Sequence, residues 1–107
     1  MKIVAHRGYS GKYPELSPLA FEKALALPIH GIECDIRLSS DGKVVAHHDP
    51  TLDRTTNGSG RVSRMTWEEL RRLKIDGGQR MLLLDELLEM LGDKTVSYTH
   101  LRAHETL

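Results

Sequence analysis

The sequence predicts an α/β fold in which a strand, a helix and a second strand form one unit. The first strand is the short apolar run at residues 2–5 (KIVA), which ends at a histidine and a glycine turn. A helix is predicted to start at Ser17-Pro18, because a hydroxyl N-cap followed by proline favours a helix start. The second strand, Ile32 to Leu38, follows a proline that ends the helix. This order predicts parallel strands with a right-handed crossover.

The stretch from Gly31 to Asp49 is predicted to be a β-hairpin. Its first run carries Glu33 and Asp35, which lie on the same face of a strand because they are two residues apart. Residues 39–42 (SSDG) have the composition of a turn. A parallel crossover needs a longer connection, so Val44 to Ala46 should run antiparallel to the first strand.

The pairing of this hairpin decides which side chains meet. A four-residue turn pairs Leu38 with Lys43 and returns His47 or His48 to the neighbourhood of Glu33. Two carboxylates and an imidazole would then converge on one place. The alternative is a hairpin whose charged residues line a solvated face, and this stretch alone leaves both interpretations open.

Composition narrows the classes of function. The 15 basic and 15 acidic residues balance, so neither a nucleic-acid-binding surface nor an acidic tail is indicated. No apolar run approaches the ~20 residues of a membrane span, and no signal-peptide pattern follows Met1. The single cysteine, Cys34, is predicted to be a buried core thiol. We expect a soluble, cytoplasmic protein with no nucleic-acid partner, and the oligomeric state stays open.

The second half of the chain is predicted to hold a long loop and two helices. Residues 49–64 are rich in Thr, Gly, Asn and Ser, and loops of this length are usually functional or disordered. Thr66 and Glu69 form a capping box for a helix of about two turns, Trp67 to Lys74. A leucine stripe predicts a second helix from Leu84 to Leu91, with a glycine stop.

Two histidines and two carboxylates indicate a reaction class. His6 and His48 are predicted at the ends of neighbouring strands, with Glu33 and Asp35 between them. Carboxylate oxygens suit Mg²⁺ or Ca²⁺ better than zinc. Such a cation can polarise a phosphoryl oxygen and acidify a hydroxyl nucleophile, while a histidine pair divides the base and acid roles. Arg7 offers a fork for phosphate oxygens.

Together these residues resemble the glycerophosphodiester phosphodiesterase family. The matching motifs are HRG at residues 6–8, PE at 14–15, ExD at 33–35 and HDPTLDRTTNG at 48–58, with the TWEEL and LDELL helices. The resemblance covers essentially residues 1–95. It implies the N-terminal part of a TIM (β/α)8 barrel of the phospholipase-C-like phosphodiesterase type, truncated in this chain.

The resemblance also implies a reaction and the residues that perform it. The family hydrolyses glycerophosphodiesters to sn-glycerol 3-phosphate and an alcohol with a divalent metal ion, Ca²⁺ or Mg²⁺. His6 and His48 would be the acid and base, and Arg7 would contact phosphate. The residues matching metal ligands are Glu33 and Asp35, and those in supporting positions are Glu15, Asp49 and His47.

Two departures from the family pattern limit this expectation. The PENT motif of the family is PELS here, so Leu16 replaces an amide near the site. The third metal carboxylate and the later strands have no counterpart before Val96. We therefore expect the chain by itself to bind metal weakly and to be inactive. The alternatives are a related phospholipase-C-like or sphingomyelinase-D-like phosphodiesterase, or a non-catalytic metal- or phosphate-binding fragment.

The last residues are unlike the rest of the chain. Residues 96–106 (VSYTHLRAHET) resemble the translation of a transposase adapter used in sequencing libraries. We therefore divide the chain into residues 1–95, a partial glycerophosphodiesterase barrel domain, and residues 96–107, a non-native tail. This tail should not pack as a barrel strand, and His100 and His104 are excluded from the chemistry. The alternative is an ordinary polar helical tail.

Overall fold

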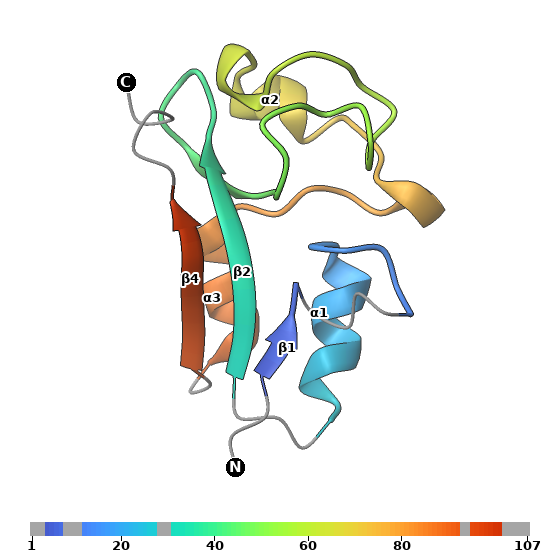
Figure 1. Cartoon of the computed structure of the whole chain (residues 1–107), viewed down its shortest axis with the longest axis vertical. Helices are drawn as coiled ribbons and strands as arrows, with labels where there is room; N and C mark the ends of the chain where they lie inside the picture. The colour runs from blue at the N-terminus through green and yellow to red at the C-terminus, as the bar shows by residue number, and fades with distance from the viewer. Residues whose placement is uncertain (1–3, 8–11, 28–30, 93–94, 102–107) are drawn as a thin grey trace.

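A four-stranded sheet with two helices on one face forms the body of the molecule (Figure 1). The computed structural model describes residues 4–7, 12–27, 31–92 and 95–101. The strands are β1 (Val4–His6), β2 (Gly31–Leu38), β3 (Val44–Ala46) and β4 (Thr95–Leu101). The helices are α1 (Pro18–Leu25), α2 (Trp67–Leu70) and α3 (Leu84–Leu91), and the 3-10 turns are η1 (Val62–Arg64) and η2 (Asp76–Gly78).

The predicted strand–helix–strand unit is confirmed. β1 pairs with β2 in parallel, with His6 opposite Glu33. The helix between them begins as expected, because Oγ of Ser17 accepts a hydrogen bond from the backbone N–H of Ala20 at 3.1 Å. α1 ends at Leu25, earlier than the proline that was predicted to stop it.

The hairpin is confirmed, but its predicted pairing is wrong by one residue. β3 runs antiparallel to β2 with Leu38 opposite Val44, not Lys43. The turn is shorter than predicted, because the N–H of Ser39 donates to the carbonyl of Lys43 at 2.9 Å and only residues 40–42 lie between this pair. Gly42 adopts a φ of 80°, a conformation that glycine reaches without strain. As a result the chain after β3 returns with the N–H of His47 bonded to the carbonyl of Asp35 at 3.0 Å.

The two faces of β2 have opposite character. Ile32, Cys34 and Ile36 are buried in a core that includes Phe21 of α1 and Leu87 of α3. Because side chains alternate along a strand, Glu33, Asp35 and Arg37 lie on the other face. The apolar face therefore attaches the helix layer, and the polar face is left for the site.

Residues 47–83 form an ordered layer with its own core, so the predicted long loop at 49–64 is present and is ordered, with η1 as its regular element. The buried residues of this second core are Val45, Leu52, Val62, Leu70, Ile75 and Met81. Hydrogen bonds from Leu52 N to Gly60 O (2.9 Å) and from Val62 N to Pro50 O (3.0 Å) close the loop on itself. In Figure 1 this layer lies beyond the carboxyl ends of β1 and β2.

Both later helices are present, although α2 is shorter than predicted. Its capping box is confirmed: Oγ1 of Thr66 accepts from the N–H of Glu69, whose Oε1 accepts from the N–H of Thr66. The helix ends at Leu70 rather than Lys74, because the following turns tighten: the N–H of Leu73 donates to the carbonyl of Leu70 at 3.1 Å, a three-residue step. The N–H of Lys74 then donates to Oδ1 of Asn57 at 2.9 Å. α3 has the predicted bounds, with Leu87 buried and Leu88 38% exposed, so only part of the leucine stripe is covered.

The expectation for the C-terminal segment is not met over residues 95–101. These residues form β4, which pairs in parallel with β2 from Gly31 to Ile36, with an irregularity between Cys34 and Asp35. β-branched and aromatic residues favour strands, and β4 covers the edge of β2 opposite β1 (Figure 1). Residues 102–107 lie outside the described part, and the adapter origin of 96–107 stays a prediction. No described helix has the length and apolar character needed to cross a bilayer.

Replacing Ser17 with alanine should destabilise the fold. The Ser17 side chain is fully buried, where its Oγ caps α1 and donates to the carbonyl of Pro14 at 2.6 Å. We expect Ser17→Ala to lower the free energy of unfolding by about 1–2 kcal/mol, measured by urea denaturation. Ser59→Ala, on an exposed loop position, is the control and should change it by less than about 0.5 kcal/mol. Equal losses would contradict the capping role.

Candidate active site

Arg7 directly follows β1 and lies beside β2. Its backbone has a conformation that is uncommon for a non-glycine residue. Its φ is 54°, in the left-handed region. The backbone is held there from both sides, because its N–H donates to the carbonyl of Glu33 at 2.9 Å and its carbonyl accepts from Leu16 at 3.0 Å. Backbone strain of this kind is concentrated at functional sites.

A continuous series of ion pairs crosses the carboxyl ends of the strands. Nε of Arg7 donates to Oδ2 of Asp35 at 2.8 Å, and its Nη1 donates to Oε2 of Glu15 at 3.1 Å. The other oxygen of Glu15 lies 2.6 Å from Nη1 of Arg54. Arg54 in turn donates to both oxygens of Asp49, at 2.8 and 3.1 Å.

The series ends on the imidazole of His48. Oδ1 of Asp49 lies 2.8 Å from Nδ1 of His48, the distance of a hydrogen bond. Because an ionised carboxylate only accepts, this contact favours the tautomer with hydrogen on Nδ1 and the lone pair on Nε2. We call the set the site ion-pair series; its members are Asp35, Arg7, Glu15, Arg54, Asp49 and His48.

The charges in this series shift the protonation of its carboxyl groups. Burial by itself would raise the pKa of Glu15, but the hydrogen bond and charge of Arg54 and the charge of Arg7 bring it below its ordinary value. Hydrogen bonding to Arg54 is the main reason that the pKa of Asp49 is far below its ordinary value, with His48 adding to it. Both groups are therefore carboxylates at neutral pH.

The two neighbouring histidines have different environments. His47 is buried, its Nε2 lies 2.9 Å from the carbonyl of Thr51, and burial lowers its pKa. The backbone of His48 is held instead by Arg37, whose Nε and Nη2 donate to its carbonyl at 3.0 and 2.6 Å. His47 therefore has a structural contact, while the catalytic assignment of His48 stays a prediction.

Glu33 and Asp35 offer oxygen atoms of the type that a divalent cation binds. They share the polar face of β2, Asp35 is almost fully buried, and Oε1 of Glu33 is buried as well. The donor type fits Mg²⁺ or Ca²⁺, but two carboxylates fill only part of the six to eight positions these ions take. Among the residues described, no group of three or more His, Cys, Asp or Glu side chains is arranged to hold a metal ion.

Of the residues predicted from the sequence, five are brought together. Arg7, Glu15, Asp35, Asp49 and His48 all belong to the site ion-pair series. The backbone of His6 is paired with that of Glu33, but the His6 side chain lies outside the described part of the molecule. The predicted meeting of His6 and His48 therefore stays a prediction.

Sequence reasoning missed two arginines. Arg37 is buried on the polar face of β2, two residues beyond Asp35, and that alternation was the signal that could have found it. Arg54 falls inside the HDPTLDRTTNG motif but was given no role. One of its partners, Asp49, is only five residues away in sequence, but the other, Glu15, lies far away in the chain. Only the folded loop brings Arg54 to Glu15.

Leu16, the departure from the family motif, has a structural consequence. Its φ is 57°, again in the left-handed region, which asparagine tolerates better than leucine. The side chain is buried in the core beside Phe21, so apolar burial offsets the strain of the backbone. At this position the chain therefore has a core contact in place of the amide of the family motif.

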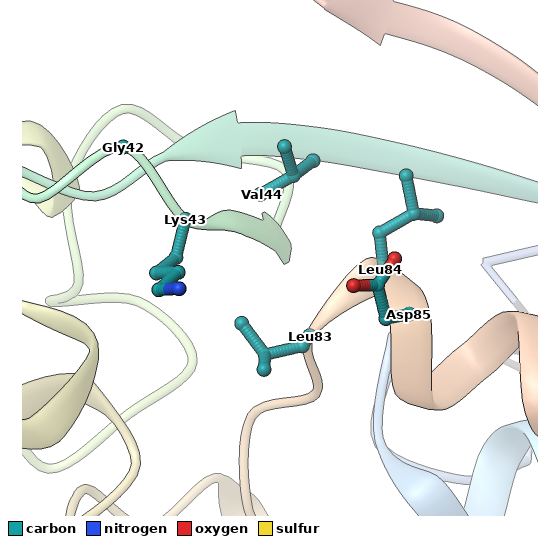
Figure 2. Close-up of a pocket in the computed structure, with 6 residues that line it drawn as sticks. All are labelled: Gly42, Lys43, Val44, Leu83, Leu84 and Asp85. Carbon is teal, nitrogen blue, oxygen red and sulfur yellow. The ribbon is translucent and has the colours of Figure 1, made fainter.

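A separate cavity lies on the hairpin, away from this chemistry. It has a volume of about 290 Å³ and is lined by Gly42, Lys43, Val44, Leu83, Leu84 and Asp85. Figure 2 shows the hairpin residues facing the start of α3 across it. None of the predicted site residues lines this cavity, so it is not the catalytic cleft.

Cys34 is excluded as a nucleophile. Its thiol is fully buried among the apolar residues, and burial, with the charges of Asp35 and Glu33, raises its pKa to about 12. It is the core thiol that the sequence predicted.

The fold and the site together define a class of protein. Parallel strands alternate with helices, and the acidic, basic and imidazole groups gather at the carboxyl ends of the strands, where TIM barrels place their active sites. The class that the fold and the site define is the N-terminal part of a TIM barrel, with its charged groups at the carboxyl ends of the strands.

Comparison with known proteins gives the family. The glycerophosphoryl diester phosphodiesterase family model matches residues 6–102. A glycerophosphodiester phosphodiesterase of Caldanaerobacter subterraneus subsp. tengcongensis is 42% identical over 99 residues, which are 86% of this chain and 41% of the relative. The relative named glycerophosphodiester phosphodiesterase from Bacillus altitudinis is 42% identical over 101 residues, 88% of this chain and 41% of its own length.

Solved structures agree with the sequence relatives. The glycerophosphodiester phosphodiesterase of Agrobacterium tumefaciens has a TM-score of 0.85 and 40% identity, covering 90% of this chain and 45% of that one. An Oleispira antarctica phosphodiesterase in complex with the product sn-glycerol-3-phosphate has a TM-score of 0.86 and 29% identity, covering 92% and 43%. The chain belongs to the glycerophosphoryl diester phosphodiesterase family, and it spans about two fifths of the length of the curated relatives.

Acid should weaken the fold through Glu15 and Asp49. Their pKa values are lower when folded than the ordinary 4.5 and 3.8, so the unfolded chain binds more protons in acid. Their stabilising contribution is therefore complete above those ordinary values and is lost as the pH falls through the lower, folded ones. We expect the free energy of unfolding, measured in urea between pH 7 and pH 2, to fall less steeply in Glu15→Gln/Asp49→Asn. Parallel curves for the two proteins would contradict this assignment.

Proposed function

We propose that the protein to which this chain belongs hydrolyses glycerophosphodiesters to sn-glycerol 3-phosphate and an alcohol, with the help of a divalent metal ion. The observation that carries the proposal is the site ion-pair series, which places Arg7 beside Asp35 and joins it to His48. Membership of the family supports the reaction class. A related structure that holds sn-glycerol-3-phosphate supports the product.

Each residue has a role that follows from its chemistry. Nε2 of His48 takes or gives a proton at the reacting oxygen, and His6 supplies the opposite role. A guanidinium has five N–H donors, and the contacts of Arg7 with Asp35 and Glu15 use two of them. The remaining edge of Arg7 suits the non-bridging oxygens of a phosphodiester.

Glu33 and Asp35 are the residues that would hold the metal ion. A bound Ca²⁺ or Mg²⁺ supplies Lewis-acid polarisation of the phosphoryl oxygen and lowers the pKa of a nucleophilic hydroxyl. The role of the chain is to present two buried oxygens on one strand face. The type of metal, the alcohol group and the cytoplasmic location stay predictions.

For the chain by itself we propose the weaker function of a binding fragment. The observation that favours this is the pair of carboxylates, Glu33 and Asp35, which leaves most of a cation's coordination to water. Phosphoryl transfer depends on charges that are oriented before reaction, and a solvated site weakens each of them.

His48 and His47 should differ strongly in their contribution to turnover. The assay uses a chimera that joins residues 1–95 to the remaining barrel of the Agrobacterium tumefaciens relative. It should release glycerol 3-phosphate from glycerophosphocholine, and a chelator should abolish the release. His48→Ala should lower kcat by about 10²- to 10⁴-fold, because a general acid–base group is lost. His47→Ala is the matched control, and equal losses at both positions would show that the assigned histidine is wrong.

The 107-residue chain should bind Ca²⁺ and Mg²⁺ weakly and should not turn over a glycerophosphodiester. Calorimetric titration with each metal and the same assay measure this, with Glu33→Gln/Asp35→Asn as the control for site-specific heat. Micromolar affinity together with turnover near that of the chimera would refute the proposal.

A further inference from the structure

Arg54 occupies the centre of the site ion-pair series without having been given a role. Its guanidinium contacts both Asp49, the partner of His48, and Glu15, the partner of Arg7. It therefore lies between the proposed proton-transfer residue and the proposed phosphate-binding residue. A positively charged fork at this place can fix the orientation of both.

The contact with Asp49 is of the kind that fixes geometry. Nε and Nη2 of Arg54 approach the two carboxylate oxygens at 2.8 and 3.1 Å, which is the bidentate arrangement. A bidentate pair prevents rotation of the carboxylate, so Oδ1 of Asp49 stays directed at Nδ1 of His48. The imidazole is then held in one orientation, and its Nδ1–H tautomer is favoured.

The loop that carries Arg54 is fixed before any substrate binds. Leu52 is fully buried, and the hydroxyl of Thr56 donates to its carbonyl at 2.7 Å. On the other side, the imidazole of His47 holds the carbonyl of Thr51 at 2.9 Å. The side chain of Arg54 is nevertheless 52% exposed, so an ordinary surface ion pair here would be worth little to stability. Its bridging position points to a use beyond stability.

We propose that Arg54 is a positioning residue that sets the orientation and tautomer of His48 through Asp49. The inference rests on the proposed function for its kinetic effect, but the state of the imidazole can be measured without any turnover. Arg54 does not contact the reacting atoms in this role. It acts through Asp49, so the two residues should behave as one unit.

The kinetic test uses the chimera described above. Arg54→Ala should lower kcat by about 10- to 100-fold with little change in KM, because a misplaced catalytic group slows chemistry more than binding. Arg54→Lys should recover only part of the rate, since an ammonium cannot form the fork. In Arg54→Ala/Asp49→Asn the losses should not multiply, because residues that act through one another are not additive.

The matched control is Arg72→Ala. Arg72 makes an exposed ion pair with Glu68 of α2, and neither residue belongs to the site ion-pair series. Loss of the Arg72 side chain should leave kcat unchanged within about twofold. A kcat within twofold of the unmodified chimera in Arg54→Ala would overturn the proposal, as would fully multiplicative losses with Asp49→Asn. A raised KM with unchanged kcat would overturn it too, because it would mean that Arg54 binds substrate directly.

A spectroscopic test separates this proposal from the proposed function. The ring nitrogens of His48, observed by NMR of the chimera labelled with ¹⁵N-histidine and assigned with His48→Gln, should show the Nδ1–H tautomer. In Arg54→Ala this tautomer should give way to a mixture. An inactive chimera would refute the proposed function, and this measurement would still decide the role of Arg54. An unchanged tautomer in Arg54→Ala would overturn the positioning role of Arg54 even if the rate falls.

Discussion

The site depends on the guanidinium of Arg7 being held between Asp35 and Glu15. Asp35 is almost completely buried, and a buried carboxylate is costly unless a positive partner accompanies it. Arg7 reaches it only because the backbone turns into the left-handed region directly after β1. The strand end, the strained residue and the following loop are therefore parts of one arrangement that places charge at the carboxyl ends of the strands.

The alternation along β2 makes this arrangement possible. Residues on one face pack against α1 and α3, which leaves the acidic and basic residues on the other face in register with one another. The second core, formed by Val45, Leu52 and other residues of the ordered layer, then covers the hairpin and carries Asp49 and Arg54 to the site. A packed layer of this kind can hold polar groups more firmly than a free loop, which is what charge-based catalysis of phosphoryl transfer requires.

The chain spans only part of the length of its relatives, and this affects which parts of the active site it can supply. Residues 6–102 match the family, but they correspond to about two fifths of the related proteins. The described residues hold an acid–base candidate, a phosphate-binding candidate and two metal-binding candidates, and the ion-pair series connects most of them. The remaining oxygen ligands of a cation would have to come from water or from further barrel strands.

Much of this molecule was determined by local features of its sequence. The capping residues Ser17 and Thr66 mark the starts of α1 and α2, and the spacing of Glu33 and Asp35 places both on one face. The motifs indicated His48, Arg7 and the family. These features are readable because a hydrogen bond to a cap or a two-residue alternation involves only neighbours in the chain.

Tertiary structure alone decided the contacts between distant residues. The hairpin pairing shifted by one residue because a backbone hydrogen bond pairs Ser39 with Lys43 and closes a shorter turn. α2 ended early because Leu73, not Lys74, bonds to the carbonyl of Leu70, and the N–H of Lys74 pairs with Asn57. β4 formed because the edge of β2 offered a partner. Arg54 meets Glu15 only after the loop folds. Such contacts depend on turn length, side-chain reach and competition for hydrogen bonds, none of which is fixed by the spacing of residues in the sequence.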